Sequence, residues 1–125
     1  HWACVAARLP DGRSLGINVS CGTNESGYRE NCAWLDGQRF DLGGAIFDFD
    51  RHDTEKPWRV TGTDGRFGLR FQAGHGYHAD HESDLMSTNF HQLFGSFEGW
   101  ILTDEGERLT LSTAPGFTES QYLRW

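Results

Sequence analysis

The chain has 125 residues, of which 37 % are hydrophobic. These values predict one soluble domain with a core of its own, and no apolar run approaches the ~20 residues that a membrane-spanning helix needs. The formal charge is -7, from 18 acidic and 11 basic residues, and the basic residues form no cluster, so we expect no nucleic-acid partner, because that needs a concentrated positive surface.

Short alternating runs separated by turn residues predict antiparallel strands along most of the chain. Three Asp-Gly pairs, at 11–12, 36–37 and 64–65, indicate tight hairpins because the turn needs a positive φ. Residues 104–106 (DEG) indicate a fourth turn. From these signals we expect strands at 2–9, 14–21, 32–35, 38–42, 45–50, 57–62, 66–72, 85–94, 96–103 and 107–113.

The expected strand 14–21 shows how each strand is built. Leu15, Ile17 and Val19 fall on one face, whereas Asn18 falls on the other. Such half-buried strands are typical of an antiparallel sheet with one face in water. We therefore predict an all-β protein in which an up-and-down meander curls into a barrel or half-barrel, because closure removes exposed edges.

Three segments interrupt this pattern. The polar stretches 22–31 and 73–83 are expected to be loops, the second being rich in histidine and acid. In the tail, Thr118 and Gln121 have the spacing of a helix-capping box, and the residues after them would pack as one helical turn. We therefore expect a short C-terminal helix.

The stretch 84–100 (DLMSTNFHQLFGSFEGW) raises the main functional question. As a strand it places Asn89 and His91 on the same face as Leu93 and Phe97, so polar and apolar residues share one face. Ligand cavities combine apolar walls with a few polar groups, which makes this pair a candidate binding site. A histidine there would also suit proton transfer near neutral pH. The alternative is a structural, hydrogen-bonded His–Asn pair.

The residues before the expected strand 32–35 form a second candidate. Glu30 and Asn31 lie at the mouth of that strand beside Tyr28. A carboxylate with Asn and Tyr nearby would bind a polar head group. Equally, Glu30 would pair with an arginine and fix the loop.

His75, His78 and His81 are a weak candidate for a metal site. Residues three apart face opposite ways on a strand, and Gly74 and Gly76 disfavour the helix on which such ligands would converge. We therefore expect neither a metal nor a cofactor.

Cys4, Cys21 and Cys32 cannot all pair, and their spacing matches no zinc site and no small disulfide scaffold. We expect free thiols in a reducing compartment, which predicts a cytoplasmic location. The chain opens inside an apparent strand without an initiator methionine, so we expect it to be the C-terminal part of a longer protein.

Five motifs together resemble one family. RLPDGRSLGINVSCG, ENCAWLDGQ, FDFDRHDTEKPWRV, TNFHQLFGSFEG and PGFTESQYLRW occur in order over nearly the whole chain. The set is similar to the C-terminal half of the bacterial family filed as domain of unknown function 2804. The resemblance implies a single lipocalin-like β-barrel domain over residues 1–125, distantly similar to the carotenoid hydratase and AttH proteins, and it assigns no activity. The positions that match family motifs are Glu30, Asn31, Asn89, Gln92, Gly95, Gly99 and Glu119.

Three functions follow as hypotheses. The first is a binding module that holds a small apolar or lipid-like ligand inside the barrel. The second is hydratase or isomerase chemistry, with Glu30 or His91 as acid or base and Asn89 as the orienting group. The third is a structural role, in which the barrel is filled by its own Phe and Trp side chains and an exposed apolar wall docks an N-terminal domain of the same protein. For the first function we expect ligand contacts from Tyr28, Asn31, Asn89, His91, Gln92, Phe97 and Trp100.

Overall fold

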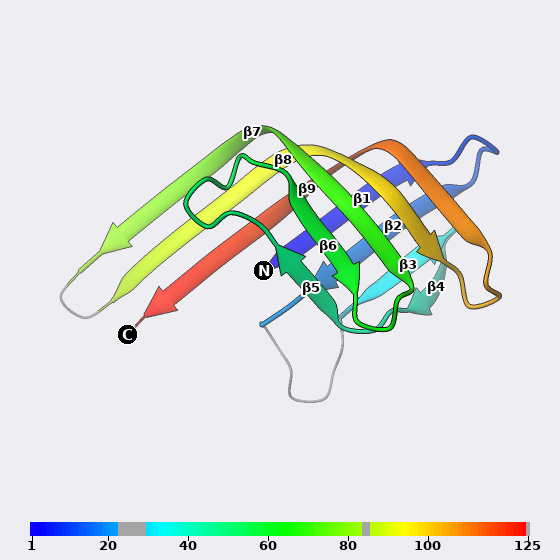
Figure 1. Cartoon of the computed structure of the whole chain (residues 1–125), viewed down its shortest axis with the longest axis horizontal. Coiled ribbons are helices and arrows are strands. Elements are labelled where there is room, and N and C mark those ends of the chain that lie inside the picture. The colour runs from blue at the N-terminus through cyan, green and yellow to red at the C-terminus, as the bar shows by residue number, and fades with distance from the viewer. Residues whose placement is uncertain (23–29, 84–85, 125) are drawn as a thin grey trace.

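The computed structural model describes residues 1–22, 30–83 and 86–124. The regular elements of these residues are strands, and none of them forms a helix long and apolar enough to cross a membrane. Nine strands follow one another along the chain (Figure 1): β1 (Trp2–Arg8), β2 (Ser14–Ser20), β3 (Cys32–Leu35), β4 (Gln38–Asp41), β5 (Ala45–Asp48), β6 (Trp58–Gly62), β7 (Phe67–Glu82), β8 (Ser87–Leu102) and β9 (Arg108–Arg124).

All nine strands belong to one sheet, in the order β4-β3-β2-β1-β9-β8-β7-β6-β5. Each strand pairs antiparallel with the strand before or after it in the chain, and the one additional pair joins β1 to β9. The sheet is not closed, because β4 and β5 are its two edges. The prediction of an all-β, antiparallel meander in the form of a half-barrel is therefore confirmed.

The three longest strands bend together, and glycines lie at the bend. Gly95 on β8 pairs with Gly116 on β9, and a β-bulge interrupts β7 next to them, at Gly74. A Cβ atom on Gly95 would overlap the carbonyl oxygen of Gln72, and one on Gly116 would overlap that of Cys4. Backbone atoms cannot move aside as a flexible side chain can, so both positions require glycine.

The bend divides these strands into two halves. The packed half comprises residues 67–73, 95–102 and 108–114, and it continues the sheet into β6 and β5. The arm comprises residues 75–82, 87–94 and 117–124. It continues the sheet into β1, since Trp2 to Val5 pair with residues 116–119 of β9. Figure 1 shows the three strands turning over together, so that their two halves run in different directions.

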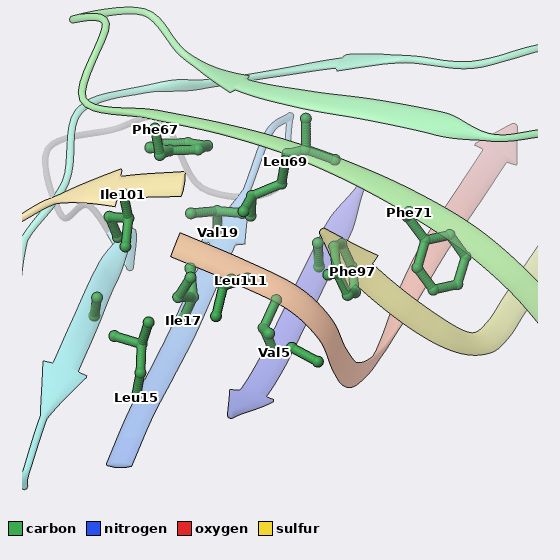
Figure 2. Packing of buried hydrophobic residues seen from close by; sticks show 14 of the residues in the cluster. Val5, Leu15, Ile17, Val19, Phe67, Leu69, Phe71, Phe97, Ile101 and Leu111 are labelled. Carbon is green, nitrogen blue, oxygen red and sulfur yellow. The ribbon is translucent and has the colours of Figure 1, made fainter. Parts of the chain in front are cut away.

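The space inside the bend is filled by the protein's own side chains (Figure 2). The packed half contributes Phe67, Leu69, Phe71, Phe97 and Ile101, and β1 and β2 contribute Val5, Leu15, Ile17 and Val19. Apart from Val5, each of these side chains is at most 2 % exposed, so no water-sized space lies beside it. This part of the interior therefore has no room for the small ligand that we expected inside the barrel.

The segment 73–83, expected to be a loop, lies almost entirely within β7. Each residue from His75 to Glu82 pairs with a residue of β8, including His78 with His91 and Asp80 with Asn89. The cross-strand hydrogen bonds satisfy the polar backbone that the composition assigned to a loop. The two strands expected at 85–94 and 96–103 are likewise one continuous strand, β8, and Leu85 lies outside the described residues.

The prediction of a C-terminal helix is wrong. β9 continues to Arg124, with Thr118 paired to Leu93 and Gln121 paired to Phe90. The side chain of Thr118 is fully buried at the bend. A capping box worth about 1 kcal/mol cannot compete with a ladder of backbone hydrogen bonds and this burial.

Candidate binding pocket on the arm

The arm carries Asn89 and His91 on the face that turns toward the interior of the fold. They precede Leu93 at intervals of two residues, and Leu93 is fully buried, so all three share one face. Their partners on that face are His78 and Asp80 on β7, and Ser120 and Tyr122 on β9. The core face of the packed half thus becomes a polar face along the arm.

Opposite this polar face lies the segment 49–54, which connects β5 to β6. Between them is an open pocket of about 410 Å³. Its lining combines aromatic rings with polar groups and consists of His1, Phe49, Arg51, Thr54, Asn89, His91, Ser120, Gln121 and Tyr122. Residues far apart in the sequence therefore form one site.

His91 is the most closely contacted polar group of this pocket. Its Nδ1 atom contacts Nδ1 of His78 and lies 3.5 Å from the hydroxyl oxygen of Thr54. Burial, and then the nearby charge of His78, lowers the pKa of His91 from its usual 6.5, while Asp80 acts in the opposite direction. His91 is therefore mainly neutral at pH 7, when one ring nitrogen can accept a proton.

The wall opposite His91 is held in place by Trp58. Its indole nitrogen donates to the carbonyl oxygen of Thr54 at 2.8 Å, and its ring stacks on Phe49 with 3.8 Å between centroids. On the arm, Asn89 donates from Nδ2 to Asp80 at 2.6 Å, which fixes the orientation of the amide. The pocket is therefore largely formed before any ligand arrives.

The charged side chains of the segment 49–56 differ in whether they are paired. Lys56 forms ion pairs with Asp50 at 2.7 Å and Asp53 at 3.9 Å. Arg51, on the same segment, makes no hydrogen bond or ion pair within the described part of the chain. No carboxylate is among the described lining residues, so the fixed charge at the pocket is positive.

A model of one protein family, domain of unknown function (DUF2804), matches residues 1–125. The chain belongs to the DUF2804 family. This confirms the family resemblance noted in the sequence motifs. No match was found to a curated protein or to a solved structure.

The residues at the start of β3 lie elsewhere in the DUF2804 domain. Asn31 is buried, accepts a hydrogen bond from the Ser20 amide at 2.7 Å, and donates to the Gly43 carbonyl at 3.0 Å. It thus joins β2 to the connection between β4 and β5. The Glu30 carbonyl accepts from Asn18 at 3.2 Å, on the β2 side. Tyr28 lies outside the described residues.

The remaining ligand-contact candidates are dispersed. Gln92 donates to Glu119 at 2.6 Å on the outer face of the arm, and Phe97 is in the core. Trp100 lies under Arg108, with 4.7 Å between the guanidinium carbon and the ring centroid. Of the seven residues expected to contact a ligand, the structure brings Asn89 and His91 together in this pocket.

The three histidines of β7 do not converge on one point. His75 and His81 lie on the outer face of the arm, whereas His78 lies on the inner face. Within the described ranges, no group of three or more His, Cys, Asp or Glu side chains could hold a metal ion. Cys4, Cys21 and Cys32 are free thiols.

Several pocket residues had not been recognised from the sequence. Phe49, Arg51 and Thr54 lie in a stretch whose alternation of Phe and Asp indicates only a strand with one wet face. Tyr122 lies where a helical turn was expected. Their role depends on the β5–β6 connection facing the arm, and no local sequence signal encodes that contact.

Proposed function

We propose that the DUF2804 domain binds a small amphipathic, lipid-like molecule in the arm pocket. The apolar part would lie against Phe49 and Tyr122, and the polar head would contact Asn89 and His91. The observation that carries this proposal is the pocket itself, which joins aromatic walls to a fixed amide and a fixed imidazole. Its volume of about 410 Å³ suits a small ligand.

A second open pocket supports placing the ligand at the arm. It has a volume of about 480 Å³ and lies at the bend, where Phe94, Pro115 and Phe117 form much of its lining. The polar side chains available there are those of His75 and Cys4. Such a surface can take an apolar group, but it offers few donors and acceptors to orient a head group. The arm pocket offers both an apolar surface and polar groups that can orient a head group.

The test is calorimetric titration with two amphiphiles, laurate and dodecan-1-ol. Tyr122→Ala and Asn89→Ala should each weaken binding about tenfold, which corresponds to the loss of one good contact. Leu123→Ala is the matched control, because Leu123 is exposed on the opposite face of the same strand. Equal affinities for wild type, Asn89→Ala and Tyr122→Ala, or equal weakening by Leu123→Ala, would contradict the proposal.

Acid–base chemistry at His91 is the second candidate function. The lowered pKa of His91 and its contact with His78 favour it as a proton acceptor. Glu30 is not among the pocket residues. Incubation with an unsaturated fatty acid, followed by mass spectrometry, would detect addition of water across the double bond. The product should disappear in His91→Ala and persist in Glu30→Gln.

The third hypothesis, docking onto an N-terminal domain, stays a prediction.

A further inference from the structure

We infer that the arm pocket selects a ligand with an anionic head group, a carboxylate or a phosphate, which is held by Arg51 and coupled to proton uptake by the His78–His91 pair. This inference rests on the proposed binding function and specifies the class of ligand. Its grounds are the charges around the pocket and the geometry of the two imidazoles.

The first ground is the free guanidinium. Arg13, Arg39, Arg66 and Arg70 form ion pairs with carboxylates. Arg51 has no such partner in the described residues, and neither have Arg8, Arg59, Arg108 and Arg124; among these five, Arg51 is the one that lines the arm pocket. The acids next to it in the sequence, Asp50 and Asp53, are occupied by Lys56. A guanidinium at the wall of a pocket presents several donors in a fork that matches a carboxylate or a phosphate.

The second ground is the type of polar group around that guanidinium. Hydroxyls and amides that can donate a hydrogen bond come from Thr54, Asn89, Ser120, Gln121 and Tyr122. The nearby carboxylate, Asp80, accepts a hydrogen bond from Asn89 and is not part of the lining. An anion in the pocket would therefore meet donors and a positive charge, and no carboxylate of the lining would repel it.

The third ground is the contact between the two imidazoles. Where Nδ1 of His78 meets Nδ1 of His91, one nitrogen has to donate and the other to accept. The pair can therefore hold one proton between its two rings, whereas a second would place two positive charges in contact. Asp80 on β7 favours the charged form of His91. Other titratable or charged groups around the pair are Arg51, Tyr122 on β9 and the His1 ring in the lining, and Asp50, Asp53 and Lys56 on the segment of Arg51.

A bound anion changes this balance. Burial lowers the pKa of His91 in the free protein, and a negative charge in the pocket would raise it again. Binding an anion should therefore take up a proton, so its affinity should increase as the pH falls through the neutral range. An uncharged ligand of the same length would show no such dependence.

The experiment compares laurate, dodecyl phosphate and dodecan-1-ol by calorimetric titration of the full chain. We expect one or both anions to bind at least about tenfold more tightly than the alcohol, and their order distinguishes a carboxylate site from a phosphate site. Arg51→Gln should remove the preference, so that the anions and dodecan-1-ol bind with similar affinity. Arg59→Gln, on β6 outside the pocket, is the matched control and should keep the preference.

Proton uptake is measured by titrating laurate at about pH 7 in two buffers of different ionisation enthalpy. We expect uptake of up to about one proton per laurate in the wild type, and none when both imidazoles are removed in the double variant His78→Ala/His91→Ala. If no amphiphile binds, the proposed function itself fails. If dodecan-1-ol binds as tightly as the anions, or Arg51→Gln keeps the preference, the binding function stands and the anion inference is overturned. Absence of proton uptake would overturn its coupling to the His78–His91 pair.

Discussion

The packed half and the arm are made from the same three strands, yet they differ in almost every other respect. In the packed half, the inward side chains of β8 are Phe97 and Ile101, which are fully buried between two parts of the sheet. On the arm, the inward side chains of the same strand are Asn89 and His91, which face the segment 49–54 across an open pocket. Leu93, between them, is still fully buried, so the chemical character of this strand face changes between Leu93 and His91.

This difference shows what makes an inward-facing residue part of a core or part of a site. The pairing pattern is antiparallel on both sides of the bend, so the strand type does not decide it. What decides it is whether another part of the sheet lies above the residue. Three sets of substitutions test this distinction.

The largest effect is expected for Phe97→Ala. Phe97 is 0 % exposed, and its ring centroid lies 4.8 Å from that of Phe71. Removing it leaves a cavity and should lower the free energy of unfolding by about 3–5 kcal/mol. Phe94 is the matched residue on the outer face of the arm and is 37 % exposed, so Phe94→Ala should cost less than about 1 kcal/mol. Urea unfolding of both variants measures the contrast, and equal losses would contradict the division into a core and an arm.

A smaller effect is expected at the bend itself. Alanine at Gly95 would force its Cβ against the Gln72 carbonyl and the Phe71 ring, at a cost of about 1–3 kcal/mol. At Gly74 the nearest atom to an added Cβ is the Phe94 carbonyl oxygen at 3.5 Å, an ordinary contact. Gly74→Ala should therefore leave the thermal midpoint almost unchanged. A drop in Gly74→Ala as large as that in Gly95→Ala would show that the bend does not depend on close backbone approach.

The smallest effect is expected far from the arm, at an exposed ion pair between two hairpin turns. Arg13 donates to Glu107 at 3.0 Å, and this hydrogen bond lowers the pKa of Glu107. The charged carboxylate therefore adds stability above its ordinary pKa near 4.5, and this stability is lost as the pH falls through the lowered value. Glu107→Gln should lower the free energy of unfolding slightly at neutral pH, and its difference from the wild type should disappear at acid pH. Because the pair is exposed, added salt should reduce the difference in stability between the wild type and Glu107→Gln. A large difference in stability at neutral pH would argue against this assignment.

Much of the fold could be predicted because its signals are local. Gly12, Gly37 and Gly65 adopt positive φ, so the three Asp-Gly turns ended the neighbouring strands where expected. Alternation likewise identified Leu15, Ile17 and Val19 as core residues. The length of β7 and β9 could not be predicted in this way. Their polar outer parts carry no strand pattern and are held by pairing to β8.

The site could be predicted only in part, for the same reason. Asn89 and His91 stood out because they interrupt a face that is otherwise apolar. Their contacts with Asp80 and His78 depend on a strand register that follows from a bulge at Gly74. Arg51 and Thr54 reach the pocket through a connection whose path depends on the whole sheet. Sequence alone thus indicated one wall of the pocket and gave no sign of the other.

The pairing of β1 with β9 has a consequence for the order in which the chain assembles. Strands β1 to β4 form one meander and strands β5 to β9 form another, and inside each meander every strand pairs with its immediate neighbour in the chain. The two meanders are joined by contacts such as Val5 with Gly116, which close a loop of nearly the whole chain. Closing such a loop costs more conformational entropy than forming a hairpin, so contacts of this kind form slowly. We therefore expect each meander to collapse early and the first strand to find the last one in the late, rate-limiting step of folding.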